Sequence, residues 1–133
     1  MLRHENLDIW EHKLKCIFDK IDDFLEEKYG KLYELHPRRA KVGETSNKEH
    51  DGLFNVGASY SLGLGSKYGA GYVIEVHFAT MEHVPDELRS EIALNVVEQL
   101  ETELPQVFPD RELSVERDGN IYKIIGDFNL GEI

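Results

Sequence analysis

The chain has 133 residues and a hydrophobic fraction of 41%, which fits one domain with a core of its own. Its net charge of −11 argues against a general affinity for DNA, RNA or anionic lipid, because Lys and Arg neutralise the phosphates of those partners. With one cysteine and no apolar run of about 20 residues, we expect no disulfide, cysteine-based zinc site or membrane span. A single cytoplasmic domain over residues 1–133, without a signal peptide, is the expectation.

The first predicted element is an amphipathic helix from about Leu7 to Tyr29. Asn6 is suited to cap it, and Gly30 is a natural stop. Its apolar stripe, spaced by three and four residues, consists of Leu7, Trp10, Leu14, Ile17, Ile21 and Phe24. Such a stripe fits packing on the protein's own sheet, and it also fits a dimer seam.

Residues 36–52 form a predicted loop without periodicity, longer than compact domains usually carry. Two interpretations of this loop are left open: it is functional, or it is merely mobile. From Phe54 to Leu62 apolar and small residues alternate, which predicts a half-buried strand. After a glycine-rich connection (63–71), a second strand over residues 72–78 completes a hairpin.

The second predicted helix begins at Pro85, and Pro105 is expected to end it. Its stripe at four-residue steps consists of Leu88, Ile92, Val96, Leu100 and Leu104. Asp118-Gly119 is a turn signal that predicts a closing hairpin, with a return strand from Ile121 to Leu130.

The order helix, hairpin, helix, hairpin predicts an α+β fold: a four-stranded, mainly antiparallel sheet with two helices packed on one face. The opposite sheet face would be open, so we expect a homodimer through that face, a sheet edge or the first helix. In element order and acidity the chain is similar in outline to secretion-chaperone dimers, although no third helix follows the last hairpin. That resemblance implies a partner-binding or accessory assembly subunit.

The most unusual stretch is the glycine-rich connection. Gly65 and Gly69 allow a ligand to approach the backbone, and Ser66 and Lys67 add a hydroxyl and a cation, as in an anion-binding nest. The spacing departs from dinucleotide loops, because Tyr68 stands where the third glycine belongs, and the segment leads into a strand instead of a helix. A wide structural hairpin is the competing interpretation.

Arg38 and Arg39 form a second candidate, since paired arginines suit bidentate binding of phosphate or carboxylate. If the loop folds over the glycine-rich hairpin, both arginines would converge with Ser66 and Lys67 on one anion. A solvated loop is the alternative.

No other pattern indicates chemistry. The six histidines lack metal-ligand spacing, so we expect no metal and no cofactor, and no nucleophile motif is present. The chain is predicted to be a non-enzymatic binding domain that acts as a homodimer on a protein or small anionic ligand. The alternatives are a small enzyme that holds a phosphorylated or carboxylated substrate with Arg38, Arg39 and Lys67, and an accessory assembly subunit.

Overall fold

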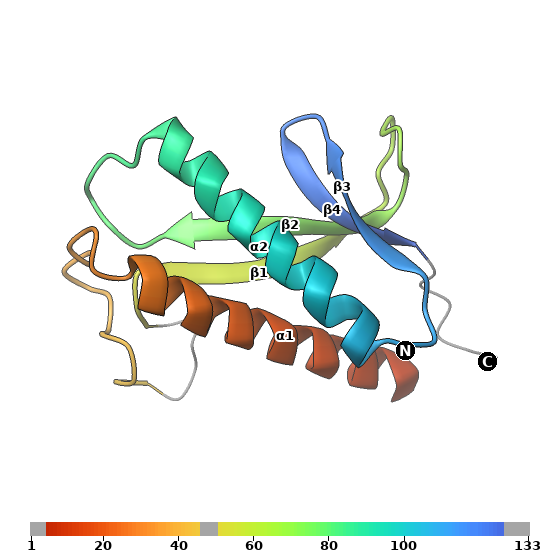
Figure 1. Cartoon of the computed structure of the whole chain (residues 1–133), viewed down its shortest axis with the longest axis horizontal. Coiled ribbons are helices and arrows are strands. Elements are labelled where there is room, and N and C mark those ends of the chain that lie inside the picture. Colours follow the sequence, from red (N-terminus) through yellow and green to blue (C-terminus); the bar gives the residue numbers. More distant parts are fainter. Residues whose placement is uncertain (1–4, 46–50, 127–133) are drawn as a thin grey trace.

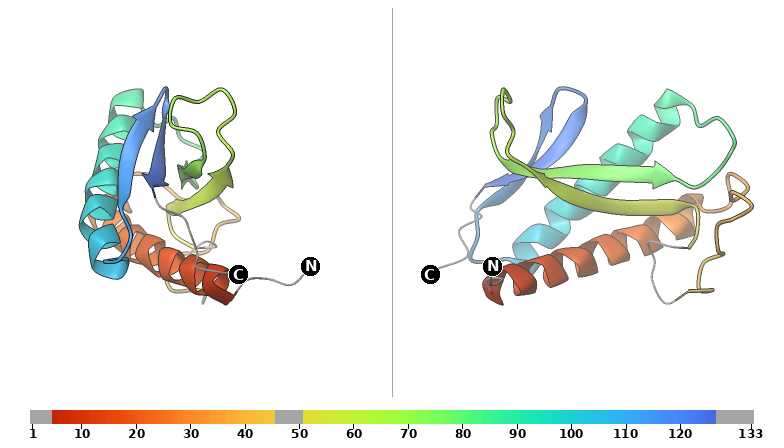
Figure 2. Two further views of the ribbon diagram at one scale, coloured as in Figure 1. Left: turned by 90° about the vertical axis from the view of Figure 1, so that its right-hand side faces the viewer. Right: turned by 180° about the vertical axis from the view of Figure 1, so that it is seen from behind.

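The computed structural model of the chain describes residues 5–45 and 51–126. Its elements are α1 (Glu5–Tyr29), β1 (Phe54–Ser61), β2 (Gly71–Phe78), α2 (Asp86–Val107), β3 (Leu113–Asp118) and β4 (Ile121–Gly126). The four strands form one antiparallel sheet, and both helices cover the same face of it (Figure 1, Figure 2). The predicted α+β class is confirmed.

The end of α2 differs from the prediction. Pro105 lies inside the last turn, and the helix continues to Val107, with a further bond from the Phe108 N–H to the Leu104 carbonyl (2.8 Å). A proline removes one helical hydrogen bond, but Leu104 and Phe108 are both buried in the core and hold the final turn in place.

None of the helices in the described ranges has an apolar stretch long enough to cross a bilayer.

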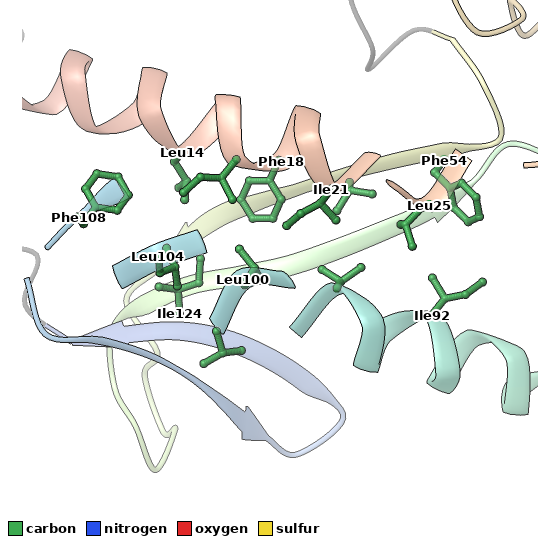
Figure 3. Packing of buried hydrophobic residues seen from close by; sticks show 14 of the residues in the cluster. Leu14, Phe18, Ile21, Leu25, Phe54, Ile92, Leu100, Leu104, Phe108 and Ile124 are labelled. Atoms are coloured by element: carbon green, nitrogen blue, oxygen red, sulfur yellow. The ribbon is translucent and has the colours of Figure 1, made fainter. Parts of the chain in front are cut away.

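The core lies between the helices and the sheet (Figure 3). Residues of the two helix stripes and the first alternate residues of β1, Phe54 and Val56, fill it. The predicted alternation does not extend the core further, because Tyr60 and Leu62 are exposed. The core members labelled in Figure 3 are Leu14, Phe18, Ile21, Leu25, Phe54, Ile92, Leu100, Leu104, Phe108 and Ile124. Burial of each such side chain contributes roughly 1.5–3 kcal/mol to the transfer free energy that favours folding.

The sheet order is β1-β2-β4-β3, so the two hairpins meet along β2 and β4. Within residues 5–45 and 51–126, only two residue pairs join them, Tyr72 with Ile124 and Val73 with Lys123. Beyond this contact the β3–β4 hairpin turns steeply away from β2, while α2 crosses in front of the angle between them (Figure 1). The predicted last strand continued to Leu130, but residues 127–130 lie outside the described part of the chain.

Candidate functional site

The glycine-rich connection folds over the open face of the sheet, the face opposite the helices, and covers Lys123. This lysine projects to that face because its neighbour Ile124 points into the core, yet only 2% of it is exposed. Its Nζ donates to Ser66 Oγ (2.9 Å) and to the Gly69 carbonyl (3.0 Å), and forms an ion pair with Asp118 Oδ2 (3.0 Å). All three donors of the ammonium group are therefore used.

Asp118 completes this arrangement from the end of β3. The Ser66 hydroxyl donates to its Oδ2, and this bond, followed by the bond from Lys123, lowers the pKa of the Asp118 carboxyl group. We call Ser66, Asp118, Lys123 and the Gly69 carbonyl the lysine staple, because it ties the connection to the second hairpin. An anion at Ser66 would face the Asp118 carboxylate, so the contacts do not favour an open anion nest at Gly65, Ser66 and Gly69.

The paired arginines lie elsewhere. Arg39 donates from Nε to the Gly52 carbonyl (3.0 Å) and from Nη2 to the carbonyls of Asp51 (2.8 Å) and Phe54 (3.3 Å). Glu26 accepts the Phe54 N–H (2.8 Å) beside it, and burial raises the pKa of that carboxyl group. Arg39 thus secures the entry into β1, while Arg38 remains exposed.

The joint anion site is not formed. Arg39 binds the first residue of β1, whereas Ser66 and Lys67 follow its last residue, Ser61, so the length of the strand, about 25 Å, separates them. Lys67 is exposed, with its Nζ 5.5 Å from the ring centre of Tyr68. An enzyme site built from Arg38, Arg39 and Lys67 together would need all three around one substrate, which this arrangement prevents.

The described part of the chain contains no cluster of three His, Cys, Asp or Glu side chains placed to hold a metal ion. Glu49 and His50, which have metal-binding side chains and belong to the predicted loop 36–52, lie outside that part.

A cleft that the sequence did not reveal lies where the two hairpins diverge. It has a volume of about 400 Å³, within the range of small-ligand sites. Its apolar walls come from β2, from the first half of α2 and from β4. The apolar residues that line it are Ile74, Val76, Phe78, Ala93, Leu94, Val96, Ile121 and Tyr122.

Two arginines flank these walls, and among the described residues no acidic one lines the cleft. The guanidinium carbon of Arg89 lies 4.7 Å from the ring centre of Phe78, and that of Arg117 lies 6.0 Å from the ring centre of Tyr122. Each uses Nε for a backbone carbonyl, Val84 for Arg89 and Gly119 for Arg117. Aromatic stacking and these bonds orient both groups, so their remaining N–H donors can serve an anionic ligand.

One signal in the sequence pointed toward this cleft. Arg89 and Arg117 are two of only four basic residues in the strongly acidic stretch 80–133. Their meeting with β2 depends on the crossing of α2 and the tilt of the second hairpin, which local patterns do not encode.

The fold and the cleft define a two-layer α+β domain with a ligand-sized opening between its hairpins. Residues 5–126 match a protein-family model described as "Uncharacterised protein", and the chain belongs to that family. The chain is 38% identical over 119 residues to a protein of Borreliella burgdorferi with the description "Uncharacterized protein". That match covers 90% of this chain and 93% of the relative. No solved structure matches the chain.

Proposed function

We propose that the protein is a non-enzymatic binding domain and that the cleft between β2, α2 and the β3–β4 hairpin is its binding site. The observation that carries the proposal is the cleft lining: apolar walls flanked by Arg89 and Arg117, without an acidic residue, in a chain of net charge −11. Such a lining suits a ligand with an apolar body and an anionic group. This site replaces the glycine-rich hairpin as the place where an anionic ligand is expected.

Titration with 1-anilinonaphthalene-8-sulfonate tests the site, because this dye joins apolar rings to an anion. The folded protein should enhance its fluorescence in a saturable manner with one site per chain. The double variant Arg89→Gln/Arg117→Gln should bind about tenfold more weakly, since it loses charge-assisted hydrogen bonds.

Lys67→Gln is the matched control, because it removes an exposed cation that does not line the cleft and should leave dye binding unchanged. Equal binding by all three proteins, or no saturable binding by the wild type, would contradict the proposal.

The homodimer remains a second proposal, supported by exposed apolar side chains at the end of β1. Tyr60, Leu62 and Leu64 are 54%, 66% and 90% exposed, and β1 is an edge strand of the sheet. Edge strands with apolar neighbours favour pairing with a second copy.

Light scattering should therefore find a wild-type dimer that Leu62→Ser/Leu64→Ser converts to a monomer. Leu32→Ser, which changes an exposed leucine that follows α1, should stay dimeric. A monomeric wild type would refute this arrangement.

A further inference from the structure

We infer that the ligand of the cleft is an extended, acidic peptide segment that pairs with β2 as an additional strand. This inference rests on the proposed function and specifies its ligand. It follows from the backbone of β2 between Ile74 and Phe78, which lines the cleft.

The direction of the backbone groups of β2 follows from its pairing with β1. Ala79 donates its N–H to the Leu53 carbonyl across this pair (2.7 Å). In an antiparallel pair, alternate residues direct their backbone groups to the same side. The groups of Ile74, Val76 and Phe78 therefore point away from β1, toward the cleft.

The start of β1 agrees with this assignment. The Phe54 N–H and carbonyl are bound by Glu26 and Arg39, which lie outside the β1–β2 pair. Phe54 is opposite Phe78 in the register, so the backbone groups of both residues are directed outward from the shared hairpin.

The side of β2 that faces the cleft is open. β4 pairs with Tyr72 and Val73 and then turns away, so no strand in the described part of the chain pairs with Ile74, Val76 or Phe78 on that side. Figure 2, seen from behind, shows the second hairpin leaving β2 at a steep angle. An unpaired strand edge of this kind accepts an extended peptide through main-chain hydrogen bonds.

Side-chain chemistry selects the kind of peptide. In an added strand, alternate residues would face α2 and contact Ala93 and the half-exposed Leu94, which favours apolar residues there. Arg89 lies over Phe78 at one end of the open edge, and Arg117 lies across the cleft beside Tyr122. Because the lining has no acid to compete, a glutamate or aspartate in the peptide would be favoured and a lysine disfavoured.

The test uses an N-acetylated, C-amidated heptapeptide in which one glutamate precedes alternating valine and threonine. Two further peptides carry N-methyl groups on alternate residues, one for each set of amides. Binding is measured by calorimetry and by hydrogen exchange of the protein amides. The unmodified peptide should bind with a Kd below about 1 mM and slow exchange at Ile74, Val76 and Phe78 by about tenfold.

At least one N-methylated peptide should bind about tenfold more weakly, because it has lost donors to β2. Replacing the glutamate with lysine should also weaken binding to the wild type, and this difference should vanish in Arg89→Gln/Arg117→Gln. Strand addition would be overturned by equal binding of the unmodified and both N-methylated peptides, by no protection of the Ile74, Val76 and Phe78 amides, or by no peptide binding. A dimer whose partner chain protects these amides without peptide would also overturn it.

The dye titration separates the two proposals. Saturable, arginine-dependent dye binding without backbone-dependent peptide binding would leave the binding cleft intact and remove only the strand-addition inference. Absence of both dye and peptide binding would remove both.

Discussion

Replacing Lys123 with methionine is expected to lower the free energy of unfolding by about 2 kcal/mol, because it removes a buried ammonium group whose partners include the partly exposed Asp118 carboxylate. Methionine has a similar length and apolar stem, so the change isolates the loss of the ammonium group. Ser66, the Gly69 carbonyl and Asp118 would all lose the donor that joins them. Denaturant unfolding measures the difference, and the melting temperature should fall by about 10 °C.

Lys67→Met is the matched control for this prediction. Lys67 belongs to the same segment but is exposed, so its replacement should change stability by no more than about 0.5 kcal/mol. Equal effects of the two substitutions would show that the lysine staple does not hold the segment.

The pH dependence of the same pair provides an independent check. The pKa of Asp118 is lowered in the folded protein, chiefly by the hydrogen bond from Ser66 and then by that from Lys123. A lowered pKa stabilises the fold above the ordinary value of about 4, and this contribution is lost as the pH falls through the lowered pKa. The stability difference between wild type and Lys123→Met should therefore shrink below about pH 4.

The second large effect is expected for Gly63→Ala, which should cost at least about 2 kcal/mol of stability. Gly63 has φ +68°, a conformation that disfavours a side chain, and an added Cβ would lie 1.9 Å from the Gly69 carbonyl oxygen. Since that oxygen accepts a hydrogen bond from Lys123, the clash would also disturb the lysine staple.

Gly65 provides the comparison, because its φ is also positive (+79°) but its Cβ would meet no atom within 4 Å. Gly65→Ala should therefore cost only the backbone term, about 1 kcal/mol. Thermal unfolding of the two variants distinguishes them. If both lose the same stability, the close crossing of the chain at Gly63 and Gly69 does not constrain the connection.

The two glycines also show how far sequence reasoning reaches within one motif. The row of glycines correctly marks a segment with unusual backbone angles. Whether each glycine serves a ligand, a turn or a close crossing depends on what lies next to it in space. Gly63 meets another part of its own connection, while Gly65 meets nothing.

The helices, strands and core follow from local periodicity, because a residue's spacing determines which side of a helix or strand it occupies. The stripe that includes Leu100 and the alternation that begins at Phe54 therefore placed both residues in the core correctly. Pro105 is the exception, since tertiary burial of the residues around it carries α2 past the expected stop.

The candidate sites depend on contacts between segments far apart in the chain. Lys123 donates a hydrogen bond to Ser66, which lies 57 positions earlier in the chain. Arg39 donates one to the backbone carbonyl of Phe54, which lies 15 positions later. The charge and hydrogen-bonding capacity of these residues could be seen in the sequence, but their partners could not. The cleft exists because, within the described residues, β4 pairs with only two residues of β2 before it turns away. The first hairpin packs on α1 through β1 and the second packs on α2 through β3, and no local pattern in the sequence encodes these contacts.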